Sequence, residues 1–422
     1  MSNQFSKEEI VAFEQVIEGF QDQLVLSQNV SKYTPDSTQM ARTNDVIWRP
    51  QPYIAQSFDG LDQTANFKNQ TQLSVPATIG YSKSSPWVMD AKEMRDAMQE
   101  GRLGEAAKQK LASDINRAIL DVASLQGTLV VKRTAAASGY DDVALCDSIM
   151  NEQGVVDYNR ALALSSRDYQ GMASNLAGRQ TMNGKPTTAY ERSYVGMIAG
   201  FDTFKLDYSK RLAAAGGGGS LTIDTRTSAG NYYVPKAVSV SATGESGNVD
   251  NRYQTITISS TAGVAAGDAF TVANMNAVHH ITKGDTGQLK TFRVISVPSS
   301  TTLVISPPII SAQGGSDAEL QYQNVVVNTA ASNSAITFLN TTAAAANPFW
   351  QKDALEIIPC RLAIPDNAGA AVMRMSTENG IEIVMQKQYD INTTRTKYRM
   401  DVLFGVVNKQ PEMSGIILFG QS

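Results

Sequence analysis

The residues that could do chemistry in this sequence are few and scattered. The two histidines, His279 and His280, are adjacent in a polar stretch. Neighbouring side chains on a strand point to opposite faces, and metal sites need several converging ligands, so this pair predicts a loop and not a metal site. With no other histidine, the sequence also lacks the base of a serine or cysteine triad.

The other chemical signals are equally weak. Cys146 and Cys360 lie far apart without companions at metal-ligand spacing, which favours buried side chains in a reducing compartment. The run Gly216 to Gly219 is not followed by the Lys and Ser or Thr of a phosphate loop. Carboxylate pairs such as Asp141 and Asp142 are expected among 40 acidic residues. We therefore predict no catalytic residue, no metal and no cofactor, and a protein that is not an enzyme.

Composition narrows the function classes further. The 422 residues include 36 basic and 40 acidic ones, which gives a net charge of −4. Tight nucleic-acid binding depends on Lys and Arg at phosphates, so this balance argues against it. The polar N-terminus does not predict a signal peptide, and no apolar run reaches the ~18 residues of a membrane span. Charged residues make up 18%, below the ~25% of typical soluble domains, which fits a surface covered by copies of the same chain.

The N-terminal segment Ser6 to Leu26 is predicted to be an amphipathic helix. Ser6 and Glu9 have the spacing of a capping box. Apolar residues recur at helical spacing along one face, at Ile10, Phe13, Ile17, Phe20 and Leu24. Acidic residues occupy the other face, at Glu8, Glu14, Glu18 and Asp22. This acidic face is either simply solvated or a docking arm for a basic partner.

Two further elements have clear patterns. Ile47 to Ile79 predicts an extended hairpin with a long polar tip, because its prolines forbid a long helix and its second half alternates apolar and polar residues. Such a projection needs support, and a neighbouring subunit would supply it. Glu105 to Gln126 predicts a long surface helix that ends at Gly127. Its apolar stripe consists of Leu111, Ile115, Ile119, Val122 and Leu125.

The next segment is mixed. Val143 to Met150 predicts a helix, and Arg160 to Ala163 predicts a strand. Ser165 can cap a helix that runs from Asp168 to Leu176. Val195 to Asp202 predicts a last short strand before the character of the chain changes.

The change occurs at Ala213 to Ser220, a flexible linker by composition. From Leu221 to about Phe338, short strands and turns predict a small barrel or sandwich. The expected strands are Gln254 to Ser260, Ala269 to Ala273, Lys290 to Val297, Thr301 to Ser306 and Tyr322 to Val327. After Asn347 the α/β texture returns, with strands at Ile381 to Met385, Arg399 to Val406 and Gly415 to Phe419. This order predicts a β domain inserted into a host domain.

A set of short motifs follows one order along nearly the whole chain: Lys32-Tyr33-Thr34-Pro35, Met40, Arg42, Ile47-Trp48, Pro50, Ala199-Gly200-Phe201-Asp202, Val249-Asp250-Asn251-Arg252, Gly267-Asp268, Thr291-Phe292, Ile305-Ser306-Pro307, Asn347, Phe349-Trp350 and Asp353-Ala354. In this combination the sequence resembles the coat proteins of short-tailed phages of the P-22 type. The linker glycines and the composition of Gln180 to Tyr194 depart from this family, and the match weakens after Cys360.

The resemblance implies an α+β fold of the Hong Kong 97 coat protein type with an inserted all-β, barrel-like domain. The implied division is an N-terminal arm at 1–45, an extended loop at 46–86, spine helix and peripheral domain at 87–135, the first part of the axial domain at 136–220, the inserted barrel at 221–340, and completion of the axial and peripheral domains at 341–422. Within the insertion, Ser239 to Arg252 corresponds to a loop that reaches across capsomers in relatives, and Asn274 to Leu289 to a second loop.

The resemblance also implies a function. We expect a major capsid protein that assembles with scaffolding protein into hexamers and pentamers of an icosahedral shell, with triangulation number seven and a portal at one vertex. It would enclose double-stranded DNA, which it touches non-specifically, would be assembled in the bacterial cytoplasm, and would contact no membrane. The expected interaction residues are the four acidic ones of the arm and the loop residues Glu245, Asp250 and Arg252. The alternatives are a host-derived nanocompartment shell and a β-rich phage surface or adhesion protein.

Overall fold

The computed structural model has an α+β fold, as expected. It describes residues 5, 7, 9–11, 13, 14, 16, 24–35, 46–52, 54–64, 66–90, 93, 97–178, 193–216, 221–223, 232–327, 334–365, 369–377 and 380–422, with the side chains of 97–101 and 176–178 left out. The chain divides into two compact units. The first comprises Met1–Ile47, Ala77–Ile119 and Glu356–Val407, and the second comprises Trp48–Pro76, Leu120–Leu355 and Asn408–Ser422.

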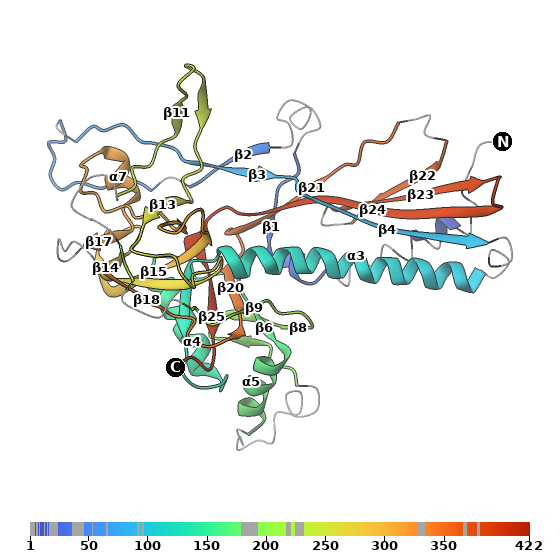
Figure 1. Ribbon diagram of the computed structural model, residues 1–422, viewed down its shortest axis with the longest axis horizontal. Coiled ribbons are helices and arrows are strands. Elements are labelled where there is room, and N and C mark those ends of the chain that lie inside the picture. The colour runs from blue at the N-terminus through green and yellow to red at the C-terminus, as the bar shows by residue number, and fades with distance from the viewer. Residues whose placement is uncertain are drawn as a thin grey trace. The chain divides into compact units, whose positions relative to one another are not determined.

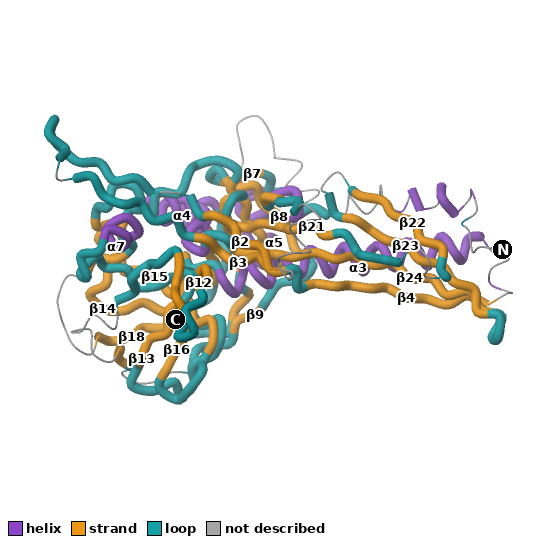
Figure 2. The backbone as a smooth tube through the Cα atoms, turned by 90° about the horizontal axis from the view of Figure 1, so that it is seen from above, coloured by secondary structure: helices purple, strands orange, loops and turns teal. Residues whose placement is uncertain are grey.

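The first unit is built on a six-stranded sheet of long strands (Figure 2). Its order is β1-β21-β24-β23-β22, and β4 also pairs with β24. The strands are β1 (Ser31–Lys32), β4 (Tyr81–Asp90), β21 (Leu355–Cys360), β22 (Ala371–Ser376), β23 (Glu382–Asp390) and β24 (Arg395–Asn408). Stacked rings link neighbouring strands, with Trp87 against Tyr398 and Tyr81 against Phe404. Such pairs contribute beyond the area that they bury.

The spine helix α3 (Ala97–Gln126) runs alongside this sheet (Figure 1). The predicted stripe is confirmed, because Leu111, Ile115 and Ile119 are buried. The helix begins eight residues before the predicted start at Glu105. Gly104 interrupted the sequence pattern, but a glycine inside a helix costs only ~1 kcal/mol, which tertiary packing offsets. Of the N-terminal helix, described positions between 7 and 16 are helical, and a 3-10 turn, η1 (Leu26–Asn29), follows.

The second unit contains another six-stranded sheet, in the order β5-β25-β20-β6-β8-β7. These strands are β5 (Leu129–Lys132), β6 (Arg160–Ser165), β7 (Met197–Ile198), β8 (Phe201–Leu206), β20 (Asn347–Gln351) and β25 (Ser414–Leu418). Alternate residues of its strands point to opposite faces of the sheet and pack into two different hydrophobic clusters. Leu129 and Ile417 pack with the helices α4 (Tyr140–Glu152) and α5 (Ser166–Gly178), whereas Val130 and Ile416 pack with Ala269 of the insertion. Both faces of the sheet are therefore covered.

The insertion module is a barrel, as predicted. Its sheet order is β10-β18-β14-β15-β16-β13, and β17 also pairs with β14. The strands are β10 (Thr222–Ile223), β13 (Gln254–Thr257), β14 (Ala269–Val278), β15 (Asp285–Ser296), β16 (Thr302–Ser306), β17 (Val325–Val327) and β18 (Ser334–Phe338). A bridge between Ile223 and Ile258 joins the two ends of the sheet. Closure removes free sheet edges, and Phe270, Phe292 and other apolar residues fill the interior.

The module is joined to the host sheet by neighbouring strands and by one buried arginine. The chain enters through β9 (Arg211–Leu212) and leaves through β19 (Ala344–Ala345), which pair with each other. Arg293 of β15 donates to the carbonyls of Ser124 and Gly127 at the end of α3, at 2.8 and 3.3 Å. A cation satisfies the free carbonyls and the negative dipole at a helix C-terminus.

Two hairpins extend from the second unit. β2 (Val46–Pro50) and β3 (Ser74–Thr78) pair at the foot of the extended loop, with Leu73, Val75 and Ala77 buried as their alternation predicts. β11 (Val238–Val240) and β12 (Ser246–Asn248) form a second hairpin, which projects from the barrel in Figure 1.

Several local predictions need correction. Tyr322 is not in a strand but ends the short helix α7 (Asp317–Tyr322), which Ser316 and Glu319 cap. Asn274 to Leu289 is not a separate loop, because β14 and β15 continue through most of it and β17 pairs with β14 there. Val195 to Asp202 splits between β7 and β8 at a turn. In the predicted flexible linker, the amides of Ala215 and Gly216 donate hydrogen bonds to the carbonyls of Asn340 and Gly263. These bonds fix the backbone of the two residues.

Candidate assembly surfaces

The hairpin β11–β12 has no buried strand residue. All six strand positions are exposed, and Val238 and Val240 are 47% and 70% exposed. Its turn is closed by local bonds, since the Glu245 amide donates to the Ser241 hydroxyl at 3.1 Å. An isolated two-stranded ribbon is marginal in water. The exposed valines make this ribbon a candidate contact surface.

A polar cluster fixes the base of this hairpin. Asn251 accepts from the Lys236 amide at 3.0 Å and donates to the carbonyls of Lys236 and Val249. Arg252 binds both carboxylate oxygens of Asp250 at 2.9 and 2.7 Å and donates to the Asn408 carbonyl at 2.9 Å. These bonds fasten both strands of the hairpin to the body of the unit.

The three loop residues expected from the sequence therefore separate into two groups. Glu245 is exposed at the hairpin turn. Asp250 and the buried Arg252 bind each other inside the subunit, at the base. A contact of these residues with another copy stays a prediction, and the geometry favours Glu245 for it.

The acidic arm is described only in part. Glu14 is exposed, while Glu8, Glu18 and Asp22 lie outside the described residues. Glu9 faces inward, where it pairs with Lys387 and accepts from the Tyr398 hydroxyl at 3.3 Å. Its partners on β23 and β24 hold the arm against the sheet of the first unit. Phe13 and Val16 are buried as well, whereas Ile10 of the predicted apolar stripe is 39% exposed.

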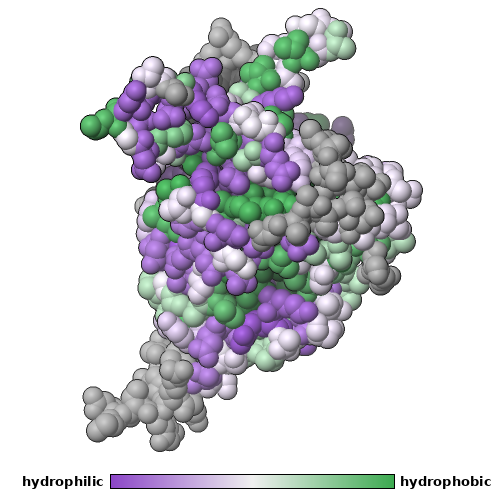
Figure 3. Space-filling model, turned by 90° about the vertical axis from the view of Figure 1, so that its left-hand side faces the viewer, coloured by the Kyte–Doolittle hydropathy of each residue, from purple (hydrophilic) through white to green (hydrophobic). Residues whose placement is uncertain are grey.

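The tip of the extended loop exposes large apolar side chains. Leu61 is fully exposed, Phe67 is 88% exposed and Phe58 is 42% exposed. The Gln63 amide donates to the carbonyls of Asp59 and Gly60, so the tip is held by its own bonds. In Figure 3 hydrophobic residues gather in separate patches on a largely hydrophilic surface. Three large apolar side chains exposed on one loop tip make it a candidate site of protein contact.

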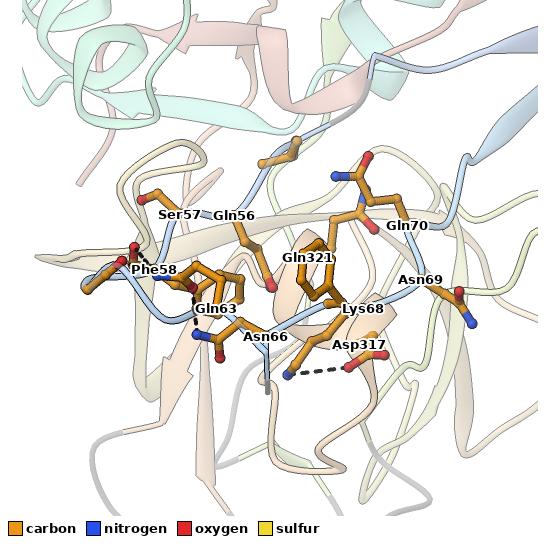
Figure 4. A pocket seen from close by; sticks show the side chains of 13 residues that line it. Gln56, Ser57, Phe58, Gln63, Asn66, Lys68, Asn69, Gln70, Asp317 and Gln321 are labelled. Atoms are coloured by element: carbon orange, nitrogen blue, oxygen red, sulfur yellow. Dashed lines mark hydrogen bonds and ion pairs between the residues drawn. The ribbon is translucent and has the colours of Figure 1, made fainter.

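The loop and α7 enclose a pocket of about 550 Å³. Figure 4 views it from close by, with Lys68 of the loop paired to Asp317 of α7 at 3.4 Å. Most of the lining is uncharged and polar, with six amide side chains, at Gln56, Gln63, Asn66, Asn69, Gln70 and Gln321. The sequence predicted the loop but not its contact with the insertion module.

A buried charge cluster lies where the module meets the host sheet. Lys290 of β15 binds Glu412 at 2.6 Å and Gln153 at 2.8 Å. His280 approaches the second oxygen of Glu412 at 3.4 Å. Glu412 belongs to the 3-10 turn η3 (Pro411–Met413), so the cluster joins three segments that are far apart in sequence. The turn position predicted for the histidine pair is confirmed, but this role of His280 was not predicted.

The electrostatics of this cluster follow from burial. Burial, reinforced by Lys290 and Lys283, lowers the pKa of His280 to about 4 despite the opposing effect of Glu412. Burial alone would raise the pKa of Glu412, but Lys290, His280 and Asn324 together lower it to about 2. At neutral pH the cluster is therefore a Lys–Glu ion pair beside a neutral imidazole.

Metal-binding groups and reactive thiols are further candidates for a chemical site among the described residues. No group of three His, Cys, Asp or Glu side chains among them could hold a metal ion. Cys146 is fully buried, and burial, together with Asp142, raises the pKa of its thiol well above the usual range. No helix in the described part of the chain is long and apolar enough to cross a membrane.

Solved structures with similar arrangements come from phage particles. A Mycobacterium phage Che8 structure matches with a TM-score of 0.44 at 10% identity, over 93% of this chain and 90% of that one. The mature capsid of bacteriophage PhiM1 matches with a TM-score of 0.41 at 10% identity, over 93% and 85%. The CUS-3 coat protein I-domain is 40% identical, with a TM-score of 0.22, and covers 29% of this chain and 96% of its own.

The family comparison covers nearly the whole chain. The family described as P22 coat protein, gene protein 5, matches residues 1–420. The arrangement described above agrees with the plan implied by the sequence resemblance: an N-terminal segment, an extended loop, a spine helix and an inserted barrel. The chain therefore belongs to the P22 coat protein family.

Proposed function

We propose that this chain assembles, with scaffolding protein, into hexamers and pentamers of an icosahedral shell of triangulation number seven around double-stranded DNA. Assembly takes place in the cytoplasm of the bacterial host, and a portal occupies one vertex. The match over residues 1–420 carries the proposal, because family membership makes the chain a major capsid protein that forms the virion shell. This family is one of structural proteins and not an enzyme class. The net charge of −4 suits a lining that packaged DNA touches without binding.

Electron microscopy of the chain expressed with and without its scaffolding protein tests this function. Closed shells of uniform diameter are expected with scaffolding, and image reconstruction gives the triangulation number. Soluble monomers or small rings in the presence of scaffolding would contradict the proposal. Closed shells of another triangulation number would correct the geometry alone.

We infer that the hairpin β11–β12 contacts another copy through Glu245, while Asp250 and Arg252 hold its base. The exposure of the valines and of Glu245 supports this division. Glu245→Lys should weaken the immature shell without changing the free energy of unfolding of the subunit. The matched control is Glu105→Lys on α3, another exposed glutamate. Equal shell stability in both variants would contradict the inference.

The acidic arm is proposed to bind a basic segment of the scaffolding protein through Glu8, Glu14, Glu18 and Asp22. The exposure of Glu14 and the inward position of Glu9 support an outward acidic face. Reversing the four charges should abolish correctly sized shells, and salt should weaken scaffolding binding to the unaltered arm. Normal shells from the reversed variant would contradict this role.

A further inference from the structure

The return limb of the extended loop is bound along its length to the insertion module. Lys68 pairs with Asp317, Thr71 contacts Gln321 and Tyr322, and Leu73 is buried against Tyr322 and Ile310. These contacts lie within the second compact unit. They join residues about 250 positions apart in the chain.

Gln321 carries the central contact. Its side-chain oxygen accepts from the Thr71 amide at 3.0 Å, and its side-chain nitrogen donates to the Thr71 carbonyl at 3.3 Å. The Gln321 carboxamide thus bonds to both the backbone N–H and the carbonyl of Thr71, as a neighbouring strand would. Gln321 is only 3% exposed, and the Tyr322 hydroxyl adds a 2.7 Å bond to the same carbonyl. Buried polar groups with bidentate partners fix one geometry and exclude others.

The position of the limb decides where the tip points. The bond from the Gln51 amide to the Leu73 carbonyl lies next to the β2–β3 pair. From there to the tip, no strand pairing between the two limbs is assigned among the described residues. The described contacts that hold the return limb at this point are those to the insertion module, at Asp317, Gln321 and Tyr322. The tip exposes Leu61 and Phe67, which need a partner surface.

We propose that α7 of the insertion module is the positioning element of the extended loop, with Gln321 as its positioning residue, and that it presents Leu61 and Phe67 to a second copy of this chain. This inference rests on the proposed shell function, which supplies the second copy. A loop ordered before association loses less conformational freedom on docking than a free one, so each contact is gained at lower cost.

Two measurements on the full-length, unassembled chain test the first step. Gln321→Ala and Tyr322→Phe should speed hydrogen exchange of the Thr71 amide, by about tenfold or more in Gln321→Ala, while β14 and β15 keep their protection. Gln323→Ala is the matched control, because its side-chain amide donates to the Val325 carbonyl inside the module. Unchanged exchange at Thr71 in Gln321→Ala would overturn the proposal.

Assembly with scaffolding protein tests the second step. Gln321→Ala should raise the critical subunit concentration about tenfold, and Gln323→Ala should leave it unchanged. Lys68→Asp should raise the critical concentration slightly. The double variant Lys68→Asp with Asp317→Lys should restore the original value, because it rebuilds the ion pair with reversed charges. Faster exchange with an unchanged critical concentration would overturn a positioning role.

The double variant Leu61→Asn with Phe67→Asn separates this inference from the proposed function. It should raise the critical concentration while leaving exchange at Thr71 slow. If its shells form normally, the tip does not contact a second copy and the inference fails, even though the shell function stands. If neither this variant nor the unaltered chain forms shells, the proposed function itself fails.

Discussion

Charged side chains of the insertion module are buried in one region and exposed in another. Where β15 meets the host sheet, Lys290 and Arg293 are fully buried and bound to Glu412, Gln153 and the end of α3. In the hairpin β11–β12, all strand residues and Glu245 are exposed. Buried charges are tolerated only where partners are fixed, whereas exposed ones keep their hydration and can adapt. One region is thus an internal joint, and the other is an exposed hairpin for which we propose a contact with another copy.

The strongest test of this contrast is Lys290→Met. Removing the fully buried ammonium leaves Glu412, which is largely buried, without its main partner, which should lower the free energy of unfolding by about 3–5 kcal/mol. Urea denaturation of the unassembled chain measures it. Lys110→Met is the control, because the Lys110 ammonium in its pair with Asp114 on α3 is largely exposed, unlike that of Lys290, and the pair should contribute less than ~0.5 kcal/mol. Similar losses in both variants would remove the distinction between joint and surface.

Acid should loosen the joint before it affects the hairpin. Because the pKa of His280 is about 4 when folded and about 6.5 when unfolded, the unfolded chain takes up the proton first as pH falls. Stability should therefore decline between about pH 6.5 and 4, by roughly 3 kcal/mol from this group. The titratable groups that act on His280 are Glu412, Lys290, Lys283 and its neighbour His279.

His280→Gln should flatten this decline, as measured by urea denaturation at a series of pH values. Glu412 acts in a lower pH range than His280. Its lowered pKa stabilises the fold above about pH 4.5, and this stability is lost as the pH falls toward 2. An identical pH profile in His280→Gln would show that the imidazole is not held neutral in the fold.

The base of the hairpin should respond less than the joint. Arg252→Ala removes the bonds to Asp250 and Asn408 and should lower the free energy of unfolding by about 2 kcal/mol, with faster hydrogen exchange from Val238 to Asn248. A loss as large as that of Lys290→Met would mean that the hairpin base is also part of the joint.

The smallest expected effect is at the hairpin turn. Glu245→Ala should change the free energy of unfolding by less than ~0.5 kcal/mol, because the side chain is exposed and the turn is closed through the Glu245 backbone. Thermal unfolding of the unassembled chain checks this. A clear destabilisation would show that the Glu245 side chain supports the subunit itself.

Local patterns in the sequence predicted much of the fold. The stripe on α3, the buried alternation at Leu73, Val75 and Ala77, and the cap at Ser165 depend on neighbours within a few residues. The helix α7 was missed, although Ser316 and Glu319 have the spacing of a capping box. Its six residues are too short for a periodic apolar pattern, which is the signal that identified the longer helices.

The contacts between distant residues at the candidate surfaces could not be predicted from local sequence patterns. Gln321 meets Thr71, and Lys290 meets Glu412, across more than a hundred residues of chain. Nothing in a single sequence marks which distant amide or carboxylate is the partner. Asp250 and Arg252 bind each other inside the subunit, and their predicted contact with another copy stays a prediction.

The pairing of β9 with β19 has a consequence for how such proteins diversify. The strands that lead into and out of the barrel lie next to each other, so a shortened gene lacking the barrel would bring together two chain ends that are already adjacent. A recombination event can therefore add, remove or exchange the whole module without rerouting the host sheet. Lineages could alter the inserted module in this way while the host sheet is inherited unchanged.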